Sequence, residues 1–343
     1  MTTRVAVAGC TGYAGAEAVR LLAAHPAVEL GALTAHGTAG SLLGEHLPHL
    51  PDLADRRIED TTAATLAGHQ VVVLALPAGA SAALAAELAQ TPLVIDCGAD
   101  FRLESAADWR DYYGFDHAGC WPYGLPELPG QRALLADAKR IAQPGCYPTA
   151  ATLALAPAIA GGLVDGRDVV VVAASGLSGA GKAAKTHLLG AETMGSVAAY
   201  GVGGGHRHVP EMLQNLRRLG AESPTLSFTP LLAPMPRGIL ATCSAPLAQE
   251  VDEAAVRRVY ADFYAPEGFV QLLAAGRWPA TGSVLGSNSA HLQVTVDRRA
   301  GRLVAVAAID NLVKGAAGGA VQSMNLALGL DEDLGLTRAG LAP

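Results

Sequence analysis

The sequence has few charged residues, few aromatic residues and no long uninterrupted apolar run. Charged residues account for 16% of the 343 residues and aromatic residues for 5%. It has no cluster of Lys and Arg of the kind that binds nucleic acid, and no stretch reaches the roughly 18 apolar residues of a membrane span. The N-terminus lacks the charged and apolar regions of a signal peptide. We therefore expect a cytoplasmic protein without a nucleic-acid or membrane partner.

Cysteine is also scarce and widely spaced. The five cysteines are Cys10, Cys97, Cys120, Cys146 and Cys243. None belongs to a Cys-x-x-Cys pair, so neither a disulfide framework nor a zinc site is indicated, and we expect no metal. The simplest interpretation is a set of reduced thiols in a reducing compartment. The question is then whether one of them has a chemical role.

The length favours two domains, because domains usually contain roughly 100–200 residues. The first third alternates predicted strands, over residues 4–9, 28–33, 71–76 and 93–95, with helices over residues 13–24 and about 78–90. Continuous apolar runs such as Val71–Leu76 are typical of parallel strands covered on both faces. This α/β pattern predicts a Rossmann-like, doubly wound parallel sheet.

The second half has a different pattern. Strands are predicted over residues 169–174, 225–230, 239–245, 292–296 and 303–309, and helices from Cys146 to about 159, over 250–264 and over 314–328. We expect an α+β domain with a mostly antiparallel sheet. Residues 1–145 and 315–343 are predicted to form a dinucleotide-binding domain, and residues 146–314 a catalytic, substrate and oligomerisation domain. The stretch 98–141 is expected to be rich in loops.

The segment Gly9–Gly15 follows a predicted strand and precedes a predicted helix. Its Gly-x-x-Gly-x-x-Gly spacing is a variant of the dinucleotide fingerprint, in which glycines permit a tight turn beside the pyrophosphate. The candidate cofactor contacts are Gly9, Thr11, Gly12, Tyr13 and Gly15.

The end of the second predicted strand lacks the carboxylate that usually binds the ribose of NAD. Residues 33–38 instead contain Thr34, His36 and Thr38 as candidates to receive a 2′-phosphate. This favours NADP (NADPH) as the cofactor, although the residues leave NAD open.

Cys146 follows Pro144-Gly145 and precedes a predicted helix with Pro148 in its first turn. Pro suits the first helical turn, and a helix N-terminus favours the thiolate form of cysteine. Thiolate is the nucleophilic form, so Cys146 is the candidate for covalent catalysis. The other four cysteines fit the role of small buried side chains better.

The segment Gly203–Glu211 places two histidines and an arginine after three glycines. A catalytic cysteine needs a base that takes the thiol proton and later returns a proton to the product. His206 and His208 are both candidates, and the sequence does not decide between them. Without a third ligand nearby, His-x-His does not favour a metal site.

With these motifs, the chain resembles the N-acetyl-γ-glutamyl-phosphate reductase family, which is related to the aspartate-semialdehyde dehydrogenases. The resemblance extends over nearly the whole chain. The matching segments are Gly9–Gly15, Asp96–Leu103, Tyr123–Glu127, Gln143–Thr149, Ser175–Lys182, Gly205–Glu211, Pro236–Ile239, Gly286–Asn288 and Asp310–Gly318.

The resemblance implies NADPH-dependent reduction of an acyl phosphate to an aldehyde through a thioester on Cys146, in arginine biosynthesis. It also implies that the base is one of His206 and His208. It further implies substrate or cofactor contacts outside the three motifs. For the substrate these are Arg102, Gln143, Lys182, Arg207 and Glu211, and for the cofactor Ser175, Gly176, Gly179 and Asn311.

Two positions depart from the family pattern. Members often carry Ser-Arg where this chain has Ala35-His36, and Asn where it has Gln143. The alternatives are a carrier-linked aminoadipate phosphate reductase, an aspartate-semialdehyde dehydrogenase and, in a different class, a non-catalytic NADP-binding sensor. The expected partners are a small-molecule acyl phosphate and further copies of the chain, as a dimer or tetramer.

Overall fold

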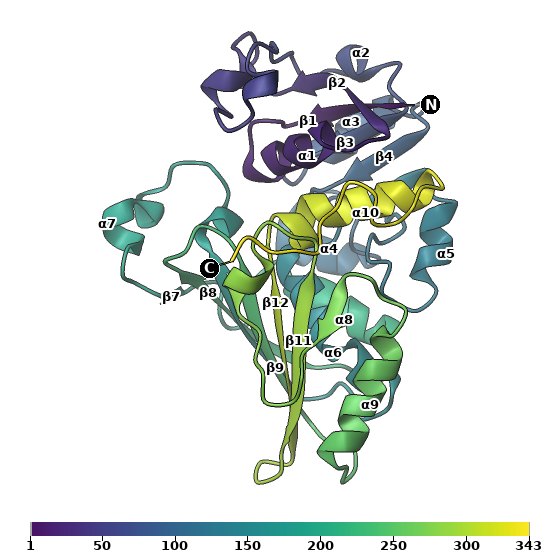
Figure 1. The fold of residues 1–343 in the computed structure, drawn as a ribbon, viewed down its shortest axis with the longest axis vertical. Coiled ribbons are helices and arrows are strands. Elements are labelled where there is room, and N and C mark those ends of the chain that lie inside the picture. Colours follow the sequence, from purple (N-terminus) through teal and green to yellow (C-terminus); the bar gives the residue numbers. More distant parts are fainter. Residues whose placement is uncertain (1, 343) are drawn as a thin grey trace. The chain divides into compact units, whose positions relative to one another are not determined.

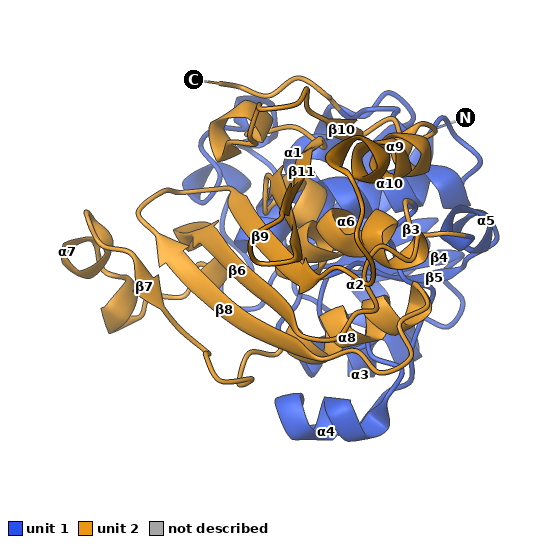
Figure 2. Ribbon diagram, turned by 90° about the horizontal axis from the view of Figure 1, so that it is seen from below, with its two compact units in different colours: residues 1–126, 130–144, 316–336 blue, residues 127–129, 145–315, 337–343 orange. Residues whose placement is uncertain are grey.

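The computed structural model describes residues 2–342, whose elements are divided between two units. Unit 1 comprises residues 1–126, 130–144 and 316–336, and unit 2 comprises residues 127–129, 145–315 and 337–343 (Figure 2). The chain passes into unit 2 at Gly145, immediately before Cys146. Within residues 2–342, no helix has the length and apolar character needed to cross a membrane.

Unit 1 is built on a five-stranded sheet of order β2-β1-β3-β4-β5, and every neighbouring pair is parallel. This confirms the predicted Rossmann-like sheet. The strands are β1 (Thr3–Ala8), β2 (Val28–Thr34), β3 (Val71–Leu74), β4 (Leu93–Asp96) and β5 (Arg140–Ala142). The helices are α1 (Tyr13–Ala23), α2 (Ala63–Leu66), α3 (Ala80–Glu87), α4 (Ala106–Tyr113), α5 (Gln131–Ala136) and α10 (Gly318–Ala327) (Figure 1).

The central strands β3 and β4 are buried along their whole length, as their apolar sequences predict. Two boundaries differ from the prediction. The strand expected over 71–76 ends at Leu74, and the strand expected over 93–95 continues to Asp96. Asp96 is fully buried, and its Oδ1 accepts a hydrogen bond from the Ser81 hydroxyl. That bond offsets part of the cost of ending an apolar strand on a carboxyl group.

The stretch 98–141, expected to be mostly loop, contains α4, α5 and β5. Helix α4 begins at a good capping residue, because the Ser105 hydroxyl accepts a hydrogen bond from the backbone N–H of Asp108. The helix is only eight residues long and buries one large side chain, Trp109. Such a short helix has too little apolar periodicity to be recognised from sequence.

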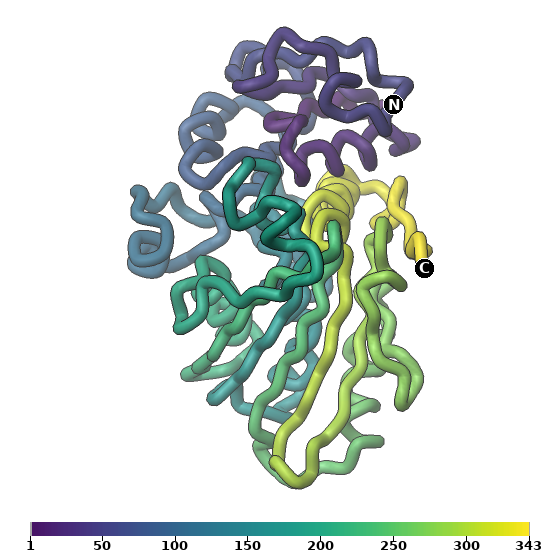
Figure 3. The backbone as a smooth tube through the Cα atoms, turned by 90° about the vertical axis from the view of Figure 1, so that its left-hand side faces the viewer, coloured from purple at the N-terminus to yellow at the C-terminus, as the bar shows by residue number. Residues whose placement is uncertain are grey.

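Unit 2 contains a seven-stranded sheet of order β10-β11-β12-β9-β6-β8-β7, whose long strands lie side by side in Figure 3. The pairs β11·β12, β12·β9, β9·β6 and β8·β7 are antiparallel, whereas β10·β11 and β6·β8 are parallel. This confirms the predicted, mostly antiparallel sheet. The strands are β6 (Val169–Gly176), β7 (Ala198–Ala199), β8 (Leu226–Ala233), β9 (Ile239–Pro246), β10 (Val270–Leu272), β11 (Ala290–Asp297) and β12 (Arg302–Ile309).

Helix α6 (Cys146–Ala160) is the central helix of unit 2, and residues 147–159 are all buried. It packs against β9 and β12, and against α8 (Val209–Arg218) and α9 (Glu253–Tyr264). Pro157 lies inside the helix and has no N–H to offer the carbonyl of Leu153, four residues earlier. The hydroxyl of Tyr264 from α9 donates to that carbonyl instead. Helix α6 therefore remains fully hydrogen-bonded at a residue that would otherwise weaken it.

The last predicted helix, over 314–328, is in fact two elements. Residues Val313–Ala317 form a π-helical turn, and the α-helix proper is α10. The boundary between the units falls inside this stretch, after Gly315. The prediction of one continuous helix missed the turn because both elements are made of small and apolar residues.

Candidate functional site

The glycine loop of unit 1 requires two of its three glycines for internal packing. Gly9 has φ +81°, and a Cβ there would lie 2.3 Å from the carbonyl O of Ala75. A Cβ on Gly15 would lie 2.1 Å from the carbonyl O of Gly9. At Gly12, the residue before α1, a Cβ would make only an ordinary 3.5 Å contact with Gly9 O. Packing among residues 2–342 therefore does not explain Gly12, which the dinucleotide fingerprint predicts to lie beside a pyrophosphate.

The residues at the end of β2 and directly after it differ in burial and in hydrogen bonding. The Thr34 side chain is fully buried, and its hydroxyl lies 2.9 Å from that of Thr61. The hydroxyl of Thr11, in the glycine loop, lies 3.2 Å from that of Thr38. His36 is exposed at the end of the strand. The glycine loop and the segment predicted to bind the ribose are thus joined through Thr11 and Thr38.

Arg102 and Gln143 meet in the interior of unit 1. The Arg102 guanidinium donates to the carbonyl O of Gln143 (2.7 Å) and to that of Cys97 (3.0 Å). The Gln143 side chain is 1% exposed, and its Oε1 lies 3.1 Å from the position that a Cβ on Gly124 would occupy. Arg102 therefore holds the main chain three residues before Cys146.

Cys146 is the first residue of α6 and is partly exposed. Gly145 caps the helix with extended backbone, and its N–H donates to Oε1 of Glu211 (2.8 Å). Both the N–H and the hydroxyl of Thr149 bond to the carbonyl O of Gly145. The Cys146 thiol is therefore held at a helix N-terminus, where the helix dipole favours a negative charge.

The two histidines pack around Tyr147, the residue after Cys146. The His206 and His208 ring centroids lie 5.6 Å and 5.9 Å from that of Tyr147 and 4.8 Å from each other. Tyr200 is 5.4 Å from His206, and its hydroxyl donates to that of Tyr147 (3.1 Å). Burial, with a smaller contribution from a negative charge on Cys146, raises the pKa of Tyr200 to about 12. The rings of His206, His208 and Tyr200 therefore gather around Tyr147 at the first turn of α6.

His206 is set up as a neutral hydrogen-bond donor. Burial, and to a lesser extent the charge of Arg207, lowers its pKa to about 4. Its Nδ1 accepts a 3.1 Å hydrogen bond from the backbone N–H of His208. The proton of the neutral ring is therefore on Nε2, because Nδ1 acts as an acceptor. A proton on Nδ1 would face the backbone N–H of His208, which is also a donor, and the hydrogen bond would be lost. His206 is therefore a poor proton acceptor.

The Ser175–Lys182 segment is held by tight backbone packing. A Cβ on Gly176 would lie within 2.8 Å of three backbone atoms of Arg237, and a Cβ on Gly179 would lie 2.7 Å from the Ser175 hydroxyl. Asn311 links the segment to the next loop, because its Nδ2 donates to the Ser178 hydroxyl and its Oδ1 accepts from the N–H of Gly238. Glycines are needed here to let the loops approach each other.

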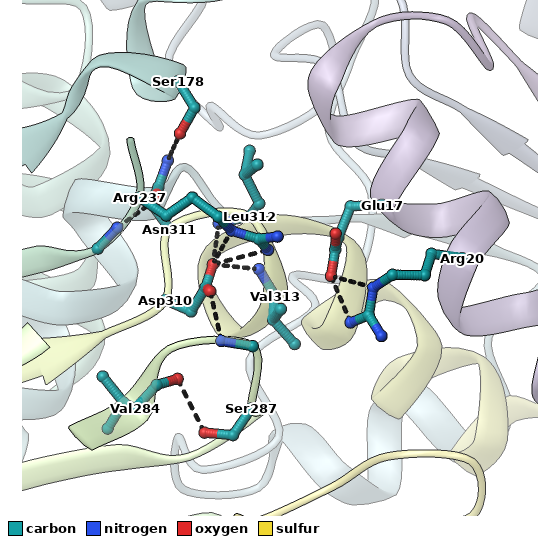
Figure 4. Close-up of polar contacts among 12 residues, drawn as sticks. Glu17, Arg20, Ser178, Arg237, Val284, Ser287, Asp310, Asn311, Leu312 and Val313 are labelled. Carbon is teal, nitrogen blue, oxygen red and sulfur yellow. Dashed lines mark hydrogen bonds and ion pairs between the residues drawn. The ribbon is translucent and has the colours of Figure 1, made fainter. Parts of the chain in front are cut away.

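Asp310, next to Asn311, is fully buried and holds several segments together (Figure 4). Its Oδ1 accepts hydrogen bonds from the backbone N–H groups of Leu312 and Val313 and from the Arg237 guanidinium. Its Oδ2 accepts a hydrogen bond from the N–H of Gly286. The carboxylate thus fixes the backbone that leads into the π-helical turn.

Of the four other cysteines, Cys10 and Cys243 are buried and Cys97 is partly buried, but Cys120 is exposed, so the expectation of a buried side chain is wrong for Cys120. Burial raises the pKa of Cys10 to about 11 and that of Cys97 and Cys243 to about 12. These thiols stay protonated at neutral pH, in contrast to what a nucleophile needs. Lys182 and Arg207 are both exposed.

Sequence patterns did not reveal several residues of the site. Tyr200 and Phe228 reach His206 only through the tertiary fold, with the Phe228 ring 5.2 Å from that of His206. Glu127 and Lys314 form an ion pair across 187 residues. Both belong to segments of the family resemblance, which was the available signal, but their partnership was not predictable.

Comparison with known proteins gives consistent matches over both units. The model of the semialdehyde dehydrogenase NAD binding domain matches residues 4–136, and that of the semialdehyde dehydrogenase dimerisation domain matches residues 146–311. The N-acetyl-gamma-glutamyl-phosphate reductase of Saccharopolyspora erythraea is 62% identical over 343 residues, all of both chains. That of Thermobifida fusca is 63% identical over 338 residues, 98% of each chain.

Solved structures show the same fold at much lower identity. Aspartate semialdehyde dehydrogenase II of Vibrio cholerae superimposes with a TM-score of 0.73 at 18% identity, covering 96% of this chain and 99% of that one. The aspartate semialdehyde dehydrogenase of Candida albicans, solved with NADP, gives 0.70 at 15% identity, covering 95% and 98%.

Proposed function

The chain belongs to the N-acetyl-gamma-glutamyl-phosphate reductase family, and we propose that it catalyses the reaction of that family. The reaction is the NADPH-dependent reduction of N-acetyl-γ-glutamyl phosphate to N-acetylglutamate 5-semialdehyde and phosphate, a step of arginine biosynthesis. The observation that carries the proposal is Cys146 at the N-terminus of α6, with His206 and His208 around the first turn.

Unit 1 is proposed to bind the dinucleotide. The unexplained Gly12, with an open Cβ position at the start of α1, fits a pyrophosphate at the helix N-terminus. Thr11 and Thr38, joined by their hydroxyls, and the exposed His36 would lie towards the ribose. Ser175, Gly176, Gly179 and Asn311 of unit 2 would hold the nicotinamide end. When bound, NADPH supplies the hydride.

Cys146 is the proposed nucleophile. Its sulfur bonds to the γ-acyl carbon, the bond from that carbon to the phosphate oxygen breaks, and the electron pair leaves with the phosphate. The thiol proton passes to a nearby imidazole. The backbone N–H of Cys146, at the start of α6, would donate to the charge that develops on the acyl oxygen.

The two histidines are proposed to have different roles. His208 takes the thiol proton, because Nδ1 of His206 already accepts the N–H of His208 and the lowered pKa of His206 keeps that ring neutral. His206 then presents its Nε2–H as a donor towards the substrate oxygen. Hydrogen-bond geometry supports this assignment, which the sequence alone left open.

The proposed substrate contacts divide into exposed cations and buried supports. Lys182 and Arg207 are exposed and would pair with the phosphate or the carboxylate of the substrate. Arg102 donates to two backbone carbonyls, and its fixed positive charge is proposed to favour the phosphate of the substrate. Gln143 and Glu211 are buried and are proposed to hold the turn that leads into Cys146.

We propose a homo-oligomer built through unit 2. Every second residue along most of β6 and β9 is at least partly accessible, and the paired residues Val172 (38% exposed) and Thr242 are exposed. Leu189, Met194, Val197 and Val202 are also exposed, from 53% to 80%. Such an apolar surface is typical of a subunit interface. Because the substrates are metabolites of the cell interior, we place the reaction in the cytoplasm.

A panel of aldehydes tests the substrate. With NADP and phosphate, N-acetylglutamate semialdehyde should be oxidised fastest, ahead of aspartate semialdehyde and an aminoadipate semialdehyde analogue. A preference for either rival would move the chain to a sister activity. Tight NADPH binding without turnover of any aldehyde would favour the non-catalytic sensor.

A further inference from the structure

An ion pair in the interior of unit 2 joins two residues that the proposed chemistry does not use, Glu127 and Lys314. Glu127 ends the segment Tyr123–Glu127, and Lys314 lies in the segment Asp310–Gly318. The Lys314 Nζ contacts Oε1 of Glu127, and both side chains are 1% exposed. The Nζ also lies 5.6 Å from the ring centroid of the buried Phe269. A buried ion pair does not by itself show that it stabilises the fold. What it lies next to in the structure therefore indicates its role better.

Lys314 lies in the π-helical turn Val313–Ala317, and Gly315, the next residue, packs against the nucleophile. A Cβ on Gly315 would lie 2.7 Å from the Cβ of Cys146 and 3.1 Å from its Cα. There is no room for a side chain between the two backbones. The turn therefore forms one wall of the position that Cys146 occupies. Turns of this kind often mark functional sites.

The turn is held at two points near its start. Before it, Asp310 accepts the backbone N–H groups of Leu312 and Val313. Within it, the Lys314 ammonium is held by Glu127, which comes from a distant part of the sequence. A fully buried, paired ammonium has little freedom to move, because separating a buried ammonium from its carboxylate partner is costly in the protein interior.

We propose that Lys314, through its ion pair with Glu127, is a positioning residue for the nucleophile. The pair holds the turn so that the Gly315 backbone rests on Cys146 and fixes where its thiol points. This inference rests on the proposed function only in taking Cys146 as the nucleophile. It adds a residue that acts through another residue and does not touch the substrate.

The test uses Lys314→Met and Glu127→Gln in the full-length protein. Each variant is assayed for kcat and KM, and for the second-order rate of Cys146 alkylation by iodoacetamide, followed by peptide mapping. We expect alkylation and kcat to fall about tenfold or more in Lys314→Met, with the KM for NADPH little changed, because small displacements of a reacting group are costly. Glu127→Gln keeps an acceptor oxygen and should show a smaller fall.

The matched control is Arg302→Met, which removes the unit 2 ion pair of Arg302 with Asp168. Arg302 begins the eight-residue strand β12, roughly 23 Å from the Ile309 end that leads to Asp310. This variant should lower the melting temperature without changing Cys146 alkylation. It separates general loss of stability from loss of positioning.

Gly315→Ala provides a second route if Lys314→Met does not fold. Its methyl group must displace Cys146, so alkylation and kcat should fall together. The proposal is overturned if a folded Lys314→Met keeps kcat and the Cys146 alkylation rate within about twofold of wild type. If Lys314→Met does not fold, the proposal is overturned when Glu127→Gln and Gly315→Ala both keep these two values within about twofold. Alkylation needs no substrate, so this result stands even if N-acetylglutamate semialdehyde proves to be the wrong aldehyde.

Discussion

The backbone N–H of Gly145 donates a 2.8 Å hydrogen bond to the carboxylate of Glu211, and this bond links α8 to the start of α6. Gly145 caps the helix that begins with Cys146, and Glu211 lies in the first turn of the helix that follows His206 and His208. This bond between a backbone N–H and a side-chain carboxylate thus joins the segment of the candidate nucleophile to the segment of the candidate bases. The arrangement assigns Glu211 a structural task at the site.

Glu211→Ala should weaken both the fold and the reaction. It leaves the buried N–H of Gly145 without its acceptor, which costs about 1–3 kcal/mol, and kcat should fall about tenfold or more as Cys146 shifts. Glu211→Gln keeps an acceptor oxygen and should remain closer to wild type. Urea unfolding and steady-state kinetics measure both effects. If Glu211→Gln were as impaired as Glu211→Ala with a raised substrate KM, the charge would be contacting the substrate instead.

Two glycines of the same loop should respond differently to alanine. Gly15→Ala places a Cβ 2.1 Å from the carbonyl O of Gly9 and should destabilise unit 1. Gly12→Ala has only a 3.5 Å contact and should leave the melting temperature near that of wild type. Its methyl group would instead meet the pyrophosphate, so the KM for NADPH should rise about tenfold or more. An unchanged KM in a well-folded Gly12→Ala would count against the cofactor site.

The stability of the protein should depend on His206 below neutral pH. Its folded-state pKa, about 4, is lower than the ordinary value of 6.5. Between these values the unfolded chain binds more protons at this residue, so the free energy of unfolding should fall as the pH is lowered from about 6.5 to 4. In His206→Gln, urea midpoints at pH 7 and pH 4.5 should differ less than in wild type. An equal difference would mean that His206 is not held neutral.

The sequence predicted the site best where chemistry follows local structure. Pro144, Gly145 and Pro148 around Cys146 define a helix start, and the structure places Cys146 at the first helical position. Gly9 and Gly15 likewise have local roles in a strand–turn–helix unit. In these cases neighbours in sequence are also neighbours in space, so spacing alone carried the information.

Residue spacing could not predict the contacts and hydrogen bonds that depend on tertiary packing. The tautomer of His206 depends on one hydrogen bond, and the contact of Gly315 with Cys146 joins residues far apart in the chain. The short helices α4 and α5 have little periodicity, and Pro157 inside α6 is explained only by the hydroxyl of Tyr264.

The pairing of Pro157 with Tyr264 can be tested by a double-mutant cycle. Tyr264→Phe should cost about 1–2 kcal/mol, because the Leu153 carbonyl is left without a donor. In a Pro157→Ala background the restored N–H of residue 157 supplies that donor, so the same change should cost less. Equal losses in both backgrounds would show that the hydroxyl does not replace the missing helix bond.

The central claim, that Cys146 carries the acyl group in the reduction of N-acetyl-γ-glutamyl phosphate, is tested most directly in the reverse direction. Wild type and Cys146→Ala are each given N-acetylglutamate semialdehyde and NADP, with and without phosphate, and formation of the reduced nicotinamide is followed by absorbance. We expect phosphate-dependent reduction in wild type and none above background in Cys146→Ala, although that variant still binds NADPH. Turnover in Cys146→Ala close to that of wild type would contradict the claim.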